Sequence, residues 1–429
     1  MQSAVVGVVR VASRFRWTVC ALLFFATVIN YMDRQILGLL APLLQHEIGW
    51  TQVQYGRIVI AFSAFYAIGL LCFGRVVDWL GTRLSYAGAM LVWSVAAMLH
   101  AAVGSVMGFA AVRALLGIGE GGNFPAAIKT TAEWFPRRER ALATGIFNSG
   151  ANIGAVFAPA IIPPIAVIYG WRAAFIIIGA IGIVWLAAWL AIYRPAERSV
   201  QDEAFDEPRD EVEALDARNA SARAPGWGEL IRKRETWAFL IGKFLTDPVW
   251  WFYLFWLPKW LNESRGMDMQ HIGPPLVVIY AITTVGSIGG GWISSTLLRK
   301  GWSVNAARKT AMLICACCVL PIAFVSQAEN LWVAVGIVGL AAAAHQGWSA
   351  NLFTTASDLF PRRALGAVVG IGGMAGSIGG VLFSEVIGQV LQRTGHYWVL
   401  FAIGALAYLL ALAIMHALTP RMAPAKLDA

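Results

Sequence analysis

Twelve long apolar stretches fill most of this chain, and they limit its possible folds more than any other feature. Charged residues are only 13% of the 429 residues, against about 25% in an average soluble protein. Each stretch approaches the roughly 20 apolar residues that a helix needs to cross a bilayer. We therefore predict an all-α polytopic membrane protein with twelve transmembrane helices. The stretches lie near residues 17–41, 56–78, 84–103, 105–132, 140–165, 172–193, 237–261, 272–298, 309–328, 330–357, 365–391 and 396–418.

A long internal repeat divides these stretches into two sets of six. Glu133-Trp-Phe-Pro-Arg-Arg138 recurs as Asp358-Leu-Phe-Pro-Arg-Arg363, so that Pro136 corresponds to Pro361 at an offset of 225 residues. A unit this long indicates a duplicated half, because the units of solenoid proteins are only about 20 to 50 residues long. We predict two pseudo-symmetric six-helix halves, residues 1–193 and 237–429, joined by a cytoplasmic linker at residues 194–236.

Positively charged residues between the stretches predict the orientation. They gather before the first stretch and in the even-numbered connections, and cytoplasmic loops carry such an excess. Both termini and both Phe-Pro-Arg-Arg turns are therefore expected in the cytoplasm. The same residues account for the net charge of +9, so no nucleic-acid partner is expected. They are Arg10, Arg14, Arg16, Arg75, Arg83, Arg137, Arg138, Arg140, Arg299, Lys300, Arg308, Lys309, Arg362 and Arg363.

Six ionisable residues lie inside the predicted spans, where an ionised side chain at the helix centre costs about 2.5 to 3.5 kcal/mol. Residues of this kind mark substrate or ion pathways by default. The alternative is that they pair with one another and hold helices together. The six are Asp33, Arg34, Arg113, Glu120, Lys243 and His345.

The depth of these residues follows from the helical rise of about 1.5 Å per residue. Asp33, Tyr66 and Arg113 all come out about 13 to 15 Å from the outer ends of their spans. Glu120 and His345 correspond under the repeat, and both come out about 22 Å deep. We therefore expect Arg113 to pair with Asp33, and Glu120 to have no fixed cation beside it.

Proline, glycine and aromatic residues add a second kind of signal. Pro248 follows Asp247 and is predicted to interrupt the seventh span, and transporters bind substrate at such interruptions. Lys243 lies four residues before Asp247, and whether the two simply neutralise each other is left open. Aromatic residues at cavity-compatible depth are Tyr31, Tyr66, Trp250, Trp251 and Trp348. Glycine runs that let helices approach closely lie at 117–122, 286–291 and 370–380.

Several segments resemble those of a known family. Gly74-Arg-Val-Val-Asp-Trp-Leu-Gly-Thr-Arg83, between the second and third spans, resembles the signature loop of the major facilitator superfamily. Asn30-Tyr-Met-Asp-Arg34, together with Arg113-Ala-Leu-Leu-Gly-Ile-Gly-Glu120, resembles the anion:cation symporter family within it. Lys243-Phe-Leu-Thr-Asp-Pro-Val-Trp-Trp-Phe-Tyr253 is similar to bacterial hexuronate transporters, which take up glucuronate and galacturonate with protons. The resemblance covers essentially the whole chain and implies a multi-pass protein of the bacterial inner membrane.

The resemblance also implies roles for individual residues. Asp33 and Glu120 would carry protons, and Arg113 would respond to them. Sugar-acid relatives place a glutamine in the fifth helix where this chain has Ala151, so the neighbouring asparagines are left to bind hydroxyl groups. The predicted substrate-binding residues are Tyr31, Arg34, Tyr66, Arg113, Asn148, Asn152, Lys243, Trp250, His345 and Trp348.

We therefore predict a proton-coupled importer of a sugar-acid monoanion, above all a hexuronate, in which two halves rock about a central site. Its partners would be the sugar acid, protons and lipid, with no obligate protein partner, no cofactor, no metal site and no enzymatic activity. One alternative is an exporter of organic anions or drugs, which should carry a Gly-Pro motif where this chain has Ala158-Pro159. Another is a non-transporting membrane sensor, for which the linker is too short and polar to form a cytoplasmic domain.

Overall fold

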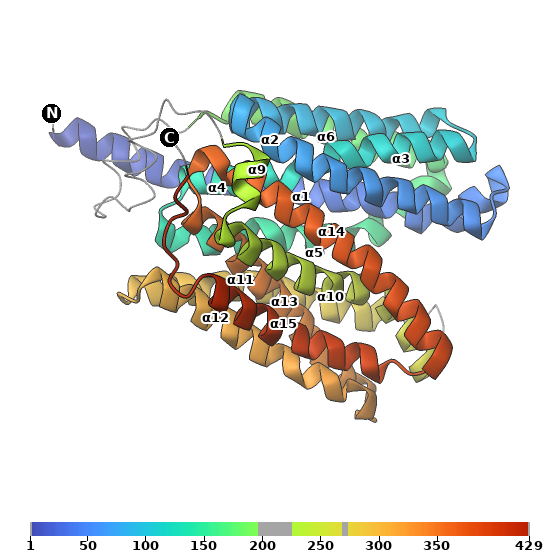
Figure 1. The fold of residues 1–429 in the computed structure, drawn as a ribbon. Coiled ribbons are helices and arrows are strands. Elements are labelled where there is room, and N and C mark those ends of the chain that lie inside the picture. The colour runs from blue at the N-terminus through green and yellow to red at the C-terminus, as the bar shows by residue number, and fades with distance from the viewer. Residues whose placement is uncertain (1, 196–224, 268–272, 428–429) are drawn as a thin grey trace.

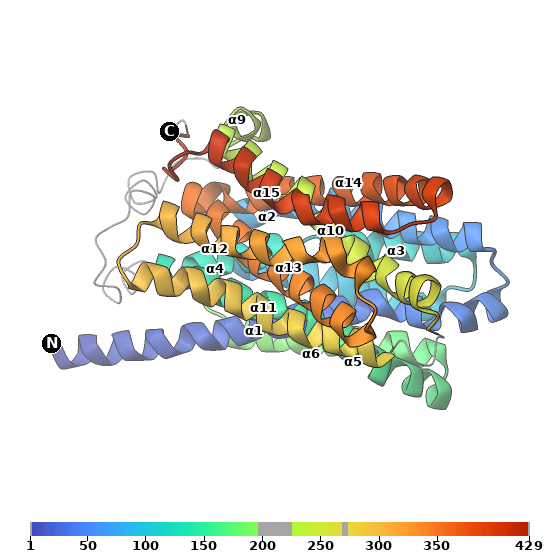
Figure 2. The ribbon, with the colours of Figure 1, turned by 90° about the horizontal axis from the view of Figure 1, so that it is seen from below.

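The computed structural model describes residues 2–195, 225–267 and 273–427, and within these ranges it contains helices and no strands. The helices form two bundles: in Figure 1 the first lies above the second, and in Figure 2, which is seen from below, much of the second lies in front of the first. The first contains α1 (Gln2–Ile48), α2 (Gln52–Leu99), η1 (His100–Ala102), α3 (Val106–Glu120), α4 (Asn123–Trp134), α5 (Arg137–Tyr169) and α6 (Trp171–Ile192). The second contains α9 (Trp227–Ile231), α10 (Arg234–Arg265), α11 (Gly273–Arg299), α12 (Val304–Val319), η2 (Leu320–Gln327), α13 (Leu331–Leu359), α14 (Arg362–Thr394) and α15 (Trp398–Leu418). Most of the predicted linker lies outside the described residues.

The all-α membrane fold predicted from the sequence is confirmed, although some helices are divided differently. Nine helical stretches of the described residues are long and apolar enough to cross a membrane. One of them, Gln54–Ala102, covers two predicted spans, and its helix α2 turns at Gly81, where φ is 75°. The seventh predicted span is α10, in which Lys243, Asp247 and Pro248 lower the hydropathy.

The fourth predicted span is divided into α3 and α4, which the sequence did not predict. α3 ends at Glu120 and α4 begins at Asn123. Pro125 has no N–H group to donate to the carbonyl of Gly121, so one hydrogen bond of a continuous helix is missing at this point. The division places Glu120 in the last turn of α3, where its side chain faces the core of the first bundle and is 0% exposed.

The predicted interruption at Pro248 is wrong, because α10 continues through it from Arg234 to Arg265. Pro248 cannot donate a hydrogen bond to the carbonyl of Phe244. That carbonyl faces Gly379 of α14 so closely that a Cβ atom there would lie 2.6 Å from the oxygen. The packing of a neighbouring helix therefore covers the free backbone group without breaking α10.

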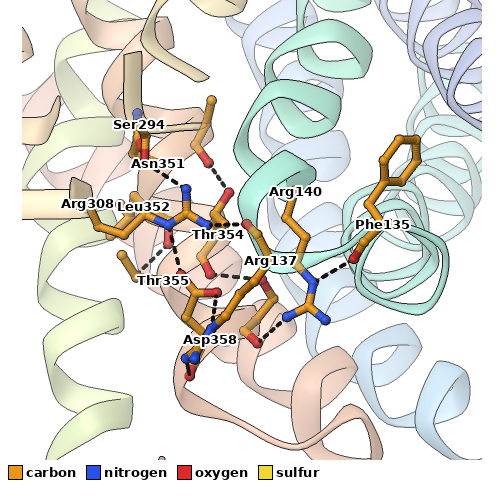
Figure 3. Close-up of polar contacts among 12 residues, drawn as sticks. Phe135, Arg137, Arg140, Ser294, Arg308, Asn351, Leu352, Thr354, Thr355 and Asp358 are labelled. Atoms are coloured by element: carbon orange, nitrogen blue, oxygen red, sulfur yellow. Dashed lines mark hydrogen bonds and ion pairs between the residues drawn. The ribbon is translucent and has the colours of Figure 1, made fainter. Parts of the chain in front are cut away.

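The two bundles are joined by buried charges at the end of the molecule that carries both termini (Figure 3). The Asp358 carboxylate on α13 accepts from Arg137 Nε of the first bundle at 3.1 Å and from Arg308 Nε at 2.8 Å. Arg308 Nη2 also donates to the Arg137 carbonyl at 2.8 Å, and Arg140 Nη1 donates to the Ser357 carbonyl at 3.4 Å. One buried carboxylate therefore holds guanidinium groups from both halves.

A second carboxylate at this end binds the start of a helix in the opposite bundle. Asp78 on α2 accepts from the backbone N–H groups of Gly366 and Ala367 on α14, at 3.0 and 2.8 Å. Lys129 Nζ lies 2.9 Å from the same carboxylate and neutralises it from within the first bundle. A carboxylate near a helix N-terminus is also stabilised by the helix dipole.

Glycines outside the predicted runs also let the bundles approach closely at this same end. Gly74 lies against the backbone of Gly366, and Gly145 lies against Ser287, with no room for a Cβ atom at either glycine. Ser287 Oγ adds a hydrogen bond to the Gly145 carbonyl at 2.8 Å. Toward the opposite end the two bundles diverge (Figure 1).

Replacing Asp358 with Asn should destabilise the protein strongly. Arg308 is 0% exposed, and removing one partner of a buried pair costs about 3–5 kcal/mol because the remaining charge stays buried. As a control, Arg172→Gln removes an ion pair to Glu47 whose side chains are 53% and 43% exposed, and it should cost only about 0–1 kcal/mol. Thermal unfolding of both purified variants measures which one loses more stability. Equal melting temperatures for Asp358→Asn and the wild type would contradict it.

Candidate functional site

A cavity of about 70 Å³ lies between the two bundles. Residues from both halves line it, and they include seven of the ten residues that the sequence assigned to substrate binding. These seven are Tyr31, Arg34, Tyr66, Asn148, Lys243, Trp250 and His345. The remaining lining residues are Leu70, Phe124, Asp247, Trp251, Gln346, Ser349, Phe353, Val369, Gly373 and Ser377.

A larger cavity of about 300 Å³ adjoins the first and shares four of its lining residues: Tyr31, Arg34, Trp250 and Trp251. Its other lining residues include Gly38 in the last part of α1 and Tyr55 at the start of α2, which lie toward the end opposite the termini. Arg113 lines this outer cavity and not the central one. The two cavities therefore form one path from the divergent end of the bundles to the centre.

Arg34 is the central cation of this path. Its Nε donates to Glu120 Oε2 at 2.7 Å, and its Nη2 donates to Asn30 Oδ1 at 3.3 Å. The guanidinium carbon lies 4.8 Å from the ring centre of Tyr31 and 4.4 Å from that of Tyr66. The sequence-based expectation that Glu120 has no cation beside it is therefore wrong. Arg34 faces the cavity, and Glu120 lies behind it, outside both linings.

The predicted pairing of Arg113 with Asp33 is also wrong. Asp33 is 1% exposed, and neither of its carboxylate oxygens has a hydrogen-bond partner among the described residues. Arg113 instead reaches the backbone carbonyl of Arg34 at 3.5 Å. Adjacent residues on a helix point about 100° apart, so the side chains of Asp33 and Arg34 cannot both point directly toward α3. The longer Arg34 side chain occupies the position beside Glu120.

A second ion pair lies within the cavity wall of the other half. Lys243 Nζ lies 2.7 Å from Asp247 Oδ2, one turn further along α10. The ammonium group also lies 4.2 Å from the ring centre of Phe353. The sequence left open whether these two residues neutralise each other, and the structure shows that they form an ion pair. Unlike Glu120, the Asp247 carboxylate lines the cavity itself.

His345 belongs to an aromatic group in the second half. Its Nδ1 is 2.7 Å from the Tyr408 hydroxyl, and its ring stacks on Trp250 with centres 5.3 Å apart and an interplanar angle of 5°. Trp348 packs edge-on against Tyr408 at 5.4 Å and is 0% exposed. Because Trp348 points toward α15, it lines neither cavity.

The two asparagines predicted on the fifth span lie in different places. Asn148 lines the cavity, and its Nδ2 donates across the bundle interface to Gln346 Oε1 at 2.6 Å. Asn152 is 0% exposed and lines neither cavity, and its amide atoms have no partner among the described residues.

Gln346 lines the cavity as well and was not predicted from the sequence, although it is a polar residue in a span directly after His345. In that span the ionisable His345 and the aromatic Trp348 were predicted, and the amide at the same depth was missed. In the described ranges, no group of three or more His, Cys, Asp or Glu side chains is placed to hold a metal ion.

Comparison with known proteins agrees with this architecture. Residues 23–384 match the family model described as "Major Facilitator Superfamily". The chain belongs to the major facilitator superfamily. The resemblance noted from its signature loop is thereby confirmed, and the protein is a multi-pass membrane protein of that fold.

Two curated relatives of this superfamily member carry names that refer to sugar acids. The chain is 31% identical over 400 residues to the "Hexuronate transporter" of Escherichia coli strain K12, covering 92% of each chain. It is 29% identical over 418 residues to the "D-galactonate transporter" of Escherichia coli O6:H1, covering 95% of each. A solved structure of the proton:xylose symporter XylE has a TM-score of 0.75 at 14% identity, covering 94% of this chain and 96% of that one. At this identity the likeness to XylE shows the fold alone.

Replacing Trp348 with Ala should affect stability more than replacing Trp250. Trp348 is enclosed in the second half of the superfamily fold, and truncation of a buried Trp costs about 3–5 kcal/mol because it leaves a cavity. Trp250 is 8% exposed and already borders both cavities, so less packing is lost. Thermal unfolding of the two purified variants measures the difference. A Trp250→Ala variant that is the less stable of the two would contradict the assignment of Trp348 to the core.

Proposed function

We propose that this protein is a proton-coupled transporter that imports a sugar-acid monoanion, above all a hexuronate, across the bacterial inner membrane. The observation that carries the proposal is the arrangement of Arg34, a cation that faces the cavity while its counter-ion Glu120 lies behind it. The similarity to transporters named for hexuronate and galactonate supports this substrate class.

A proton on Glu120 would free Arg34 for the substrate. While Glu120 is ionised, it holds Arg34 Nε at 2.7 Å. Once it is protonated, the guanidinium can bind the substrate carboxylate in the two-pronged geometry that favours arginine. Tyr31, Tyr66 and Trp250 then provide aromatic surface for the sugar ring. Binding of the anion and of the proton would thus favour each other.

Asp33 is the second proposed proton carrier. An ionised carboxylate that is buried without a partner is strongly unfavourable, and Asp33 has no hydrogen-bond partner among the described residues. Its neutral, protonated form suits this environment. Arg113 lies within the same group of charges and would compensate Asp33 when the proton leaves.

Transport would proceed by rocking of the two halves about the central cavity. With both termini in the cytoplasm, the closed end formed by Asp78 and Asp358 is the cytoplasmic gate, and the path past Tyr55 opens outward. The ion pairs of the closed end would separate when the substrate is released to the cell. On this interpretation the structure corresponds to the outward-open state.

Hexuronates should stabilise the purified protein, and Arg34→Gln should abolish the effect. A ligand at 100 times its Kd stabilises by about 2.7 kcal/mol, so galacturonate or glucuronate should raise the melting temperature, whereas glucose and galactose, which lack the carboxylate, should not. Arg172→Gln, on an exposed pair far from the cavity, should respond as the wild type does. A wild-type protein stabilised by drugs and not by sugar acids would favour the exporter, and an unchanged response in Arg34→Gln would remove Arg34 from the anion site.

Glu120→Gln should separate exchange from accumulation. The amide mimics the protonated carboxyl, so uronate should still bind at Arg34 and exchange between two pools. A gradient of one pH unit drives about tenfold accumulation per coupled proton, because one unit corresponds to about 1.36 kcal/mol. Gradient-driven uptake into proteoliposomes should therefore fall about tenfold in this variant. Accumulation equal to that of the wild type would show that the coupling proton is carried elsewhere.

A further inference from the structure

The two ion pairs of the cavity differ in where they place the carboxylate. Glu120 is 0% exposed and lies outside the lining, so that Arg34 alone faces the substrate. In the second pair both partners line the cavity, and the Asp247 side chain is 16% exposed. A substrate would therefore meet a cation in the first half, but a cation and an anion together in the second.

The Asp247 carboxylate is fixed where it stands. Lys243 holds Oδ2 at 2.7 Å, and the same oxygen lies against Gly376 of α14 so closely that a Cβ there would collide with it. The absence of a side chain at Gly376 makes room for the carboxylate, and the packed helix blocks its withdrawal on that side. An incoming group cannot reach Lys243 without approaching this negative charge.

A charge count shows how many carboxylates the cavity can accept. Among the groups that line the central cavity, Arg34 is balanced by Glu120 behind it and Lys243 by Asp247 when all four are ionised. Arg113 lines the outer cavity and is not part of this count. Protonation of Glu120 alone leaves one uncompensated positive charge, which matches one substrate carboxylate. A second carboxylate at Lys243 would face an ionised Asp247, and like charges at close range repel each other.

We propose that Asp247 is a specificity-determining residue that restricts the cavity to monocarboxylates. This inference rests on the proposed function and specifies its substrate class. Lys243 donates and Asp247 accepts, so the pair suits the hydroxyl groups at the uncharged end of a sugar acid, since each hydroxyl both donates and accepts. The charge on Asp247 excludes a sugar diacid, which would carry a second carboxylate at that end.

Competition binding with matched probes tests the proposal. Galacturonate and galactarate both have six carbons with one carboxylate and several hydroxyl groups. Galacturonate closes into a pyranose ring with an uncharged far end, whereas galactarate is an open chain with a second carboxylate there, so the comparison of Asp247→Asn with Asp247→Glu separates the effect of charge from that of shape. The wild type should bind galacturonate at least about tenfold more tightly, since each tenfold step is about 1.4 kcal/mol. Asp247→Asn frees Lys243 and removes the negative charge, so the preference should fall by about tenfold or reverse. Asp247→Glu keeps the charge and should keep the preference for galacturonate.

A second measurement needs no variant. Above pH 5.5 galactarate is a dianion, and its binding to the wild type should require a proton on Asp247 as well as one on Glu120. Its affinity should therefore rise more steeply than that of galacturonate as the pH falls from 8 to 5.5, by about one further factor of ten per unit. The titratable and charged groups around Asp247 are Lys243 on α10, His345 on α13, Tyr408 on α15, and Tyr31, Arg34 and Tyr66 across the cavity. The same slopes in His345→Gln would assign the difference to Asp247 and not to the imidazole.

The outcomes separate the inference from the proposed function. Wild-type protein that binds galacturonate, with an unchanged ratio in Asp247→Asn or equal pH slopes for the two acids, overturns the role of Asp247 and leaves the transporter proposal intact. Wild-type protein that prefers galactarate overturns the role as well. Wild-type protein that binds neither acid overturns both.

Discussion

An ionised side chain buried among these helices needs an opposite charge nearby, because the surrounding protein and lipid cannot solvate it as water does. Three buried groups meet this need in different ways. Arg34 and Glu120 pair within the first half, and Lys243 and Asp247 pair within the second. Asp358 instead joins guanidinium groups of both halves. Pairs within a half can respond to a ligand without moving the halves. The ion pair between Arg137 and Asp358, which joins the halves, must break when they rock.

The overall fold could be predicted from the sequence because hydropathy and an internal repeat depend only on local composition. Those signals gave the helical membrane fold and its six-plus-six arrangement. They could not predict whether a helix continues through a proline or is divided there. Pro125 divides a span, whereas Pro248 does not, since Gly379 of another helix covers the carbonyl that Pro248 leaves free. The effect of a proline therefore depended on a contact more than 130 residues away in the chain, which no local pattern contains.

The depth of the site residues along their helices could be predicted from the sequence, but the direction in which each side chain points could not. Helical rise placed Tyr66 and His345 at depths that the cavity covers. Rotation about each helix axis comes from packing, and it decides which of two neighbours faces the cavity. Depth alone paired Arg113 with Asp33, whereas the structure places Arg34 against Glu120. The same difficulty placed Trp348 in the cavity, although it packs against Tyr408 of α15 and lines neither cavity.

The repeat also reveals how the two halves have become different. Glu120 and His345 occupy equivalent positions, 225 residues apart. Glu120 bonds a cation that faces the cavity, whereas His345 bonds the Tyr408 hydroxyl and stacks on Trp250. The first half thus carries groups suited to binding a proton and an anion together, and the second carries groups suited to contacting a sugar. Under the proposed function, a substrate bound to both halves would link the protonation state of one to the recognition surface of the other, which is the coupling that a rocking transporter requires.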